Sequence, residues 1–93
     1  MTVVHQIRLR GFWDVTPLPD GRERHVRRFG RPRMLDPDET LWVVCDAAAV
    51  SVNGHAVEPR DGAFNVTELL QPRNELAIET DRELEVVLEI RKN

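Results

Sequence analysis

The chain has 93 residues, a formal net charge of −3 at neutral pH and one cysteine. This length allows a single small domain, residues 1–93, and the lone cysteine excludes an internal disulfide. No apolar run approaches the roughly 20 residues of a membrane-spanning helix, and the start of the chain lacks a signal-peptide pattern. We therefore expect a cytoplasmic protein that does not enter a membrane.

The N-terminal third is basic and predicts two strands and a hairpin. Apolar residues alternate with polar ones over Val3–Leu9, which indicates a strand ending at Gly11. Phe12–Thr16 is expected to be extended, and Pro17–Gly21 has the composition of a turn that leads into a returning strand over Arg22–Phe29. Arginines occupy both faces of this returning strand, which is typical of a sheet edge or of a functional groove.

The middle of the chain contains the clearest local signal. After a crossing loop over Gly30–Glu39, two strands are expected over Leu41–Asp46 and Ala48–Asn53, with Cys45 as a buried small hydrophobe. Asn53-Gly54 then predicts a two-residue hairpin turn, because both residues tolerate positive φ. This turn places Val52 opposite His55 and Val50 opposite Val57.

The C-terminal part predicts two further strands after a short one. Phe64–Val66 alternates as a short strand would, and Thr67–Leu70 allows only one helical turn. The alternation over Asn74–Glu79 and Leu84–Ile90 predicts two strands with one buried face each, joined as a hairpin, with Glu89 on the solvated side. Eight or so short strands with almost no helix predict an all-β, antiparallel β-sandwich.

The central stretch resembles the sugar-binding domain that precedes the barrel in family 2 glycoside hydrolases, the β-galactosidases and β-glucuronidases. The matching positions follow the order of the motifs of that domain and extend from about Val26 to Glu79. They are Arg28, Phe29, Pro32, Leu41, Trp42, Val43, Val50, Val52, Asn53, Gly54, Gly62, Phe64, Val66, Thr67, Leu69, Leu70, Asn74 and Leu76.

The resemblance implies a jelly-roll, galactose-binding-domain-like fold, in a shortened and standalone form. In the resembled enzymes the catalytic acids belong to the barrel domain, which this chain lacks. The resemblance therefore implies a non-catalytic module that binds carbohydrate or is accessory to a glycoside hydrolase.

The residue pattern also predicts no enzyme chemistry and no cofactor. The metal-ligating residues His5, His25, His55 and Cys45 are scattered along the sequence with no pair at short spacing. Ser51 and Cys45 lie in no recognisable nucleophile motif. We expect neither a catalytic residue nor a metal site.

Three residues are candidates for ligand contact. Trp13 lies beside Gly11 and a turn, where an indole ring can stack on a sugar, whereas Trp42 lies in an apolar strand and is expected in the core. His25 and Arg27 lie on the arginine-rich strand. Trp13, His25 and Arg27 are thus the predicted carbohydrate contacts.

Two alternatives remain open. The small core favours a self-associating or partner-binding structural protein, for example a homodimer without a small ligand. The run Arg22–Arg33 favours an anionic polymer. However, residues 34–93 carry thirteen acidic against five basic residues, whereas residues 1–33 carry eight basic against three acidic ones, so the acidic remainder argues against nucleic acid.

Overall fold

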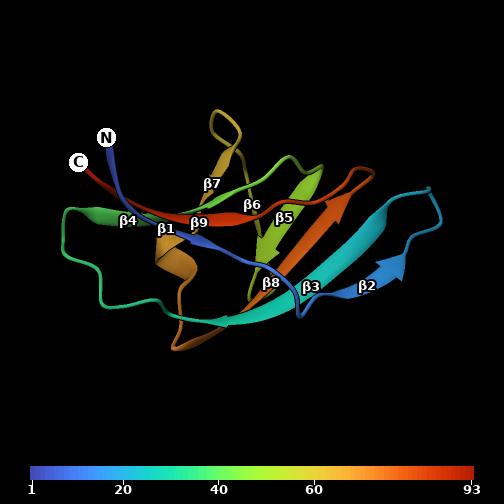
Figure 1. The fold of residues 1–93 in the computed structure, drawn as a ribbon, viewed down its shortest axis with the longest axis horizontal. Coiled ribbons are helices and arrows are strands. Elements are labelled where there is room, and N and C mark those ends of the chain that lie inside the picture. The colour runs from blue at the N-terminus through green and yellow to red at the C-terminus, as the bar shows by residue number, and fades with distance from the viewer.

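The computed structural model describes residues 1–93 and shows two antiparallel sheets packed face to face (Figure 1). The four-stranded sheet has the order β1-β9-β4-β7, and the five-stranded sheet has the order β2-β3-β8-β5-β6. The strands of the first are β1 (Thr2–Arg8), β9 (Val87–Lys92), β4 (Glu39–Val44) and β7 (Ala63–Asn65). Those of the second are β2 (Asp14–Pro17), β3 (Glu23–Gly30), β8 (Arg73–Thr80), β5 (Ala49–Val52) and β6 (His55–Val57). The predicted antiparallel β-sandwich is confirmed.

The core lies between the two sheets and takes alternate residues from each strand. Leu41 and Val43 face inward from β4, and Leu76 and Ile78 face them from β8. The strand β8 pairs with β3 on one side and with β5 on the other, which makes it the centre of its sheet. One helical turn, η1 (Thr67–Leu69), follows β7. No helix in the structure has the length and apolar character needed to cross a membrane.

The Asn53-Gly54 hairpin is confirmed in both conformation and register. Asn53 has a φ of 53° and Gly54 a φ of 81°, and Val52 pairs with His55 across the turn. The Asn53 side chain adds three hydrogen bonds that no turn requires. Its Nδ2 donates to the Leu69 carbonyl and to Asn74 Oδ1, and its Oδ1 accepts from the Glu75 amide.

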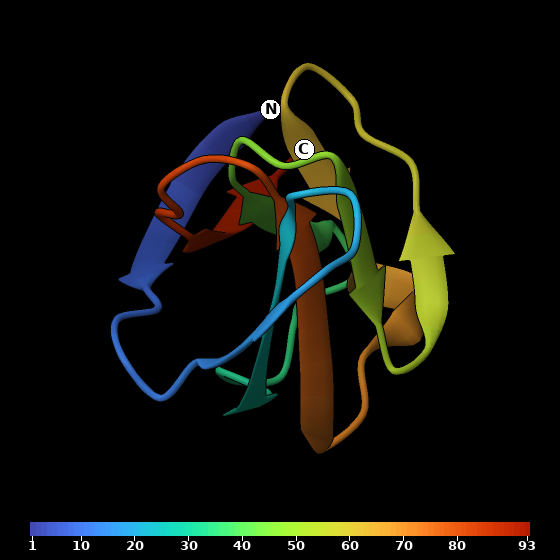
Figure 2. The same ribbon diagram turned by 90° about the vertical axis from the view of Figure 1, so that its right-hand side faces the viewer.

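The predicted hairpin between the last two strands is wrong. Although β8 and β9 follow each other in sequence, β9 pairs with β1 and β4 in the opposite sheet. Residues 81–86 cross from one sheet to the other, and Val86 is buried in the core before the strand begins (Figure 2). An alternating pattern specifies which face of a strand is buried, but it does not specify the partner strand.

Glu89 is buried on the outer face of the four-stranded sheet, although the alternation of the last strand predicts that it is solvated. Glu89 is only 9% exposed and accepts hydrogen bonds from Gln6 Nε2 and from the Arg91 guanidinium. Arg91 in turn lies over the Trp42 ring, 4.5 Å from its centroid. The solvated position predicted for Glu89 is therefore wrong, and Trp42 is buried on the outer side of its sheet, apart from the main core cluster.

A β-bulge interrupts the alternation predicted for the first strand. Val3 pairs with Arg91 and His5 with Ile90, which leaves Val4 without a partner. The extra residue moves Val3 out of the inward-facing row of His5 and Ile7.

The arginine-rich strand β3 is an edge strand over only half of its length. It pairs with β8 from Glu23 to Gly30, but β2 covers only Glu23–Val26. Residues 27–30 therefore present a free edge to solvent. The cause is the shortness of β2, which begins only at Asp14, because Gly11 and Phe12 both have positive φ. The extended conformation predicted for Phe12 is wrong.

Candidate ligand-binding site

The segment 9–13 closes the side of the sandwich at which β1 and β2 end the two sheets (Figure 2). Leu9 fixes its start, because its side chain is buried and its amide donates to the Val86 carbonyl. The chain then turns through Gly11 and Phe12, with φ values of 72° and 62°. A left-handed conformation is an outlier for a bulky residue such as phenylalanine. It holds the Phe12 side chain in solvent, where it is 89% exposed.

Trp13 packs against His25 at the rim of the core. The two rings meet edge to face at a centroid distance of 6.3 Å, and Trp13 Nε1 donates to the Leu9 carbonyl. The His25 side chain is 13% exposed, and its Nε2 has no hydrogen-bond partner, although Glu23 Oε1 lies 3.4 Å away. Trp13 is thus positioned by the core and the backbone.

Arg27 extends from the inward-facing row of β3, two residues beyond His25. Its guanidinium carbon lies 5.7 Å from the centroid of the Phe12 ring. Its Nε and Nη1 are buried and make no hydrogen bond, and no carboxylate forms an ion pair with it. A buried cation without a counter-charge is costly. This guanidinium is therefore partly desolvated without a counter-charge, and a nearby anion would stabilise it.

Three surface hollows are lined by residues of this region: the first by Gly11 and Trp13, the second by Phe12 and Arg27, and the third by Arg28. The first has a volume of about 320 Å³ and is lined by Arg8, Arg10 and Trp13 together with residues of the 84–87 segment. The second, of about 430 Å³, lies along the free edge of β3 between Phe12 and Glu75. The third, of about 440 Å³, lies beyond it and shares Arg28 and Glu75 with the second. We call the second and third together the β3-edge groove. Its lining residues are Phe12, Asp14, Val26, Arg27, Arg28, Asn53, Arg73, Asn74 and Glu75.

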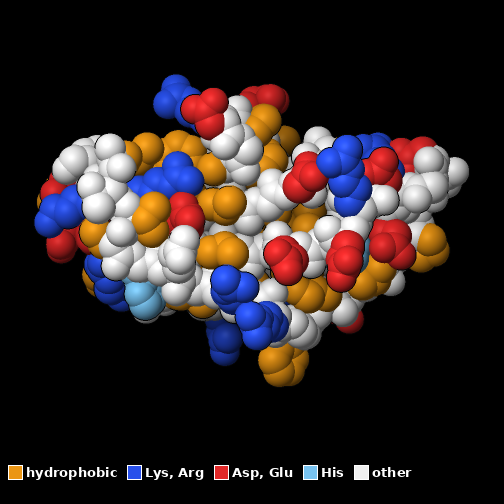
Figure 3. Space-filling model, turned by 45° about the horizontal axis from the view of Figure 1, so that its top comes forward, with side chains coloured by type: hydrophobic (Ala, Val, Ile, Leu, Met, Phe, Trp, Pro, Cys, Tyr) orange, Lys and Arg blue, Asp and Glu red, His pale blue; other side chains and the backbone are white.

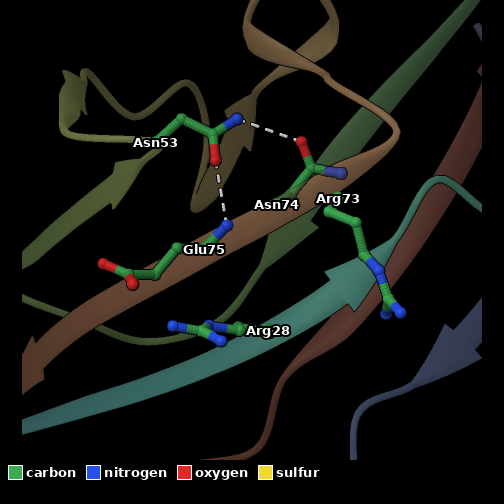
Figure 4. Close-up of a pocket in the computed structure, with 5 residues that line it drawn as sticks. All are labelled: Arg28, Asn53, Arg73, Asn74 and Glu75. Atoms are coloured by element: carbon green, nitrogen blue, oxygen red, sulfur yellow. Dashed lines mark hydrogen bonds between the residues drawn. The ribbon is translucent and has the colours of Figure 1, made fainter.

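The third hollow offers three charged groups to a ligand (Figure 4). Arg28 and Glu75 are paired positions on neighbouring strands, and their side chains extend in the same direction. The Arg73 guanidinium lies apart from them. The amides of Asn53 and Asn74 point toward each other and bond to each other. Since those amides hold the fold together, the free groups are the two guanidiniums and the carboxylate.

The structure brings the three predicted contact residues together. Trp13 touches His25, and Arg27 lies two residues further along the same strand, over the neighbouring Phe12. The sequence prediction missed Phe12, Arg28 and Arg73 as part of the site. Phe12 had one available signal, namely its position directly after the glycine that ends the first strand.

The single cysteine, Cys45, lies outside these three hollows. Burial, with a smaller contribution from Asp46, raises the pKa of the Cys45 thiol to about 11, so this thiol is unreactive at neutral pH. No group of three His, Cys, Asp or Glu side chains is close enough to hold a metal ion. What the arrangement can do is bind a ligand, through an aromatic ring and several unpaired guanidiniums.

No family model matches the chain, and no curated protein or solved structure matches it either. Its chemistry must therefore be inferred from its own residues.

Proposed function

We propose that this protein is a non-catalytic carbohydrate-binding module with a jelly-roll, galactose-binding-like fold, accessory to a glycoside hydrolase. The observation that carries the proposal is Phe12, an exposed aromatic residue in a left-handed conformation beside Trp13 and the unpaired Arg27. Strained conformations of this kind concentrate at ligand-binding sites. An aromatic face next to a hydrogen-bond donor matches the alternating apolar and polar surface of a sugar ring.

The residues on which the resemblance to the glycoside hydrolase domain rests have structural roles that support the proposed fold type. Asn53 and Gly54 form the β5–β6 turn, and Asn74 is buried beneath it with all of its hydrogen-bonding capacity in use. These are structural tasks. They support a common scaffold and leave the ligand to be identified by experiment.

A saccharide titration followed by ¹⁵N NMR tests the proposal. With a panel of neutral and acidic oligosaccharides, we expect shifts at the Trp13 indole and at residues 25–28. Phe12→Asn removes the ring while asparagine tolerates the left-handed backbone, so it is expected to weaken binding at least several-fold without loss of stability. Met34→Ala, which removes another exposed apolar side chain, is the control. The absence of shifts with every saccharide would overturn the proposal.

A second candidate function is self-association through β1. This strand is an end strand of its sheet and has seven residues, whereas the other end strands β2, β6 and β7 have four, three and three. Val3 and Val4 on it are exposed, as is the preceding Met1. A long free edge with apolar side chains can pair with the same edge of a second copy.

Light scattering distinguishes this candidate. A dimer that becomes monomeric on Val3→Lys, but not on Val15→Lys on the short edge strand β2, would support a β1–β1 interface. A wild-type monomer at high concentration would rule it out.

A further inference from the structure

The arginines of this protein divide into two groups by their partners. Five of them form ion pairs with a carboxylate, and seven form none. The paired ones are Arg22, Arg24, Arg33, Arg82 and Arg91. The unpaired ones are Arg8, Arg10, Arg27, Arg28, Arg31, Arg60 and Arg73. Thus the run Arg22–Arg33 is largely neutralised at its two ends and free in its middle.

Five of the seven unpaired arginines line the three hollows described above. Arg8 and Arg10 line the first hollow, and Arg27, Arg28 and Arg73 line the β3-edge groove. They come from three separate segments of the chain, which only the fold brings to one side. In the space-filling view, Lys and Arg side chains gather along the lower margin beside a projecting hydrophobic side chain (Figure 3).

The acids in the same hollows are fewer. They are Asp14, Glu75 and Glu85, and none of them forms an ion pair with the five arginines. The lining therefore carries an excess of positive charge in a protein whose total charge is −3. Such a local excess attracts anions to this side of the molecule.

We infer that the ligand of this site is an acidic polysaccharide, whose carboxylate groups bind the unpaired guanidiniums while a sugar face stacks on Phe12. The inference rests on the proposed function. A guanidinium binds a carboxylate through two parallel hydrogen bonds, and the exposed guanidiniums of Arg28 and Arg73, which form no ion pair, are free to make them, while Arg27 adds a further positive charge. The two adjoining hollows of the β3-edge groove, which share Arg28 and Glu75, fit an extended chain better than a single sugar.

The acids and aromatics of the groove favour a polysaccharide over a nucleic acid. Single-stranded nucleic acid is bound by several aromatic rings on which successive bases stack. Here Phe12 alone is fully available, because the Trp13 ring packs against His25 and the core. Asp14 and Glu75 would repel the carboxylates of a polysaccharide as well as phosphates, but they can accept hydrogen bonds from sugar hydroxyls, which a polysaccharide carries on every ring.

The test uses a pair of probes with the same sugar chain, in which the carboxyl groups are either charged or methyl-esterified and neutral. Oligogalacturonate and its fully methyl-esterified form, of equal length, are titrated by calorimetry into the full chain. We expect the acidic form to bind about tenfold more tightly or better, with an affinity that falls as salt increases. Arg28→Gln, an exposed position whose change should not affect folding, is expected to weaken acidic binding about tenfold. Arg60→Gln is the matched control, because Arg60 is unpaired but lies outside these hollows.

Each outcome decides the inference. Equal affinity for the two oligosaccharides would overturn it while leaving the proposed function standing. Binding of neither would also overturn it, and the saccharide panel would then decide the proposed function separately. Equally tight binding of single-stranded DNA at the same salt concentration would replace the polysaccharide by a nucleic acid. Equal losses for Arg28→Gln and Arg60→Gln would show that the site is elsewhere.

Discussion

Replacing Asn74 with alanine should remove the polar group that joins four segments of the fold. Asn74 is the second residue of β8 and is 2% exposed. Its Oδ1 accepts from the Gln71 amide at 2.8 Å and from Asn53 Nδ2 at 3.0 Å. Its Nδ2 donates to the Gln71 carbonyl at 2.9 Å and, more weakly, to the Phe29 carbonyl at 3.4 Å. The side chain thereby connects β3, the β5–β6 turn and the loop before β8.

The size of the effect follows from these bonds. A typical hydrogen bond contributes about 1 kcal/mol, and a buried group left without its partner costs about 1–3 kcal/mol. Three good bonds are lost, and the partners at Gln71 and Asn53 remain near the cavity. We therefore expect Asn74→Ala to lower the free energy of unfolding by about 3–4 kcal/mol. For a domain of this size, with an unfolding entropy of about 0.2 kcal/mol/K, this corresponds to a fall in Tm of about 15–20 °C.

Thermal and urea unfolding followed by circular dichroism measure this loss. Gln71→Ala is the control, because Gln71 bonds to Asn74 only through its backbone. It should change stability by no more than about 0.5 kcal/mol. A loss below about 1 kcal/mol for Asn74→Ala would refute the assignment of Asn74 as the junction of these segments.

Three further predictions concern the turn, the crossing loop and the outer face. Gly54→Ala should lower the free energy of unfolding by about 1–2 kcal/mol, because alanine is strained at the positive φ of this position. An added Cβ meets no atom within 4 Å, so no steric clash contributes, and an unchanged urea midpoint would contradict this prediction. Hydrogen bonds from the Arg33 guanidinium and the Asp36 amide lower the pKa of Glu39 from its ordinary value of 4.5 to about 2. The ionised Glu39 therefore contributes fully to the free energy of unfolding above pH 4.5, and this contribution is lost as the pH falls toward 2. The excess Tm of the wild type over Glu39→Gln should shrink across that range, and a pH-independent difference would refute the ion pair. Glu89→Ala should lower the free energy of unfolding by about 1–3 kcal/mol, because it leaves the Arg91 guanidinium without its carboxylate partner. Equal Tm values for this variant and the wild type would show that Glu89 is solvated.

The candidate site was predictable in part from residue types. Trp13, His25 and Arg27 stand out because a tryptophan beside a turn and basic residues on a strand are the groups that bind polar ligands. The contact between Trp13 and His25 depends on the β2–β3 hairpin, whose turn over Pro17–Gly21 is itself evident from the sequence. Phe12 could not be assigned in the same way, because its exposure results from a backbone conformation that phenylalanine does not prefer.

The distribution of free charge could not be read from the sequence at all. Arg24 and Arg28 are equivalent in the alternation of β3, yet Arg24 forms an ion pair with Glu79 while Arg28 has no such partner. Both lie directly opposite a glutamate of β8. Which arginine is neutralised depends on side-chain geometry across the strands, and sequence spacing contains no information about it.

Local chemistry is sufficient to specify the class of fold. Period-two alternation, the Asn53-Gly54 turn and the Pro17–Gly21 turn each act within a few residues, so they predict strands, hairpins and an antiparallel sandwich. The choice of strand partners is decided only in the tertiary structure. β9 joins β1 and β4 because burying its apolar face against the opposite sheet is a property of the whole core. The free edge of β3, and with it the groove and its unpaired arginines, is a consequence of that long-range assembly.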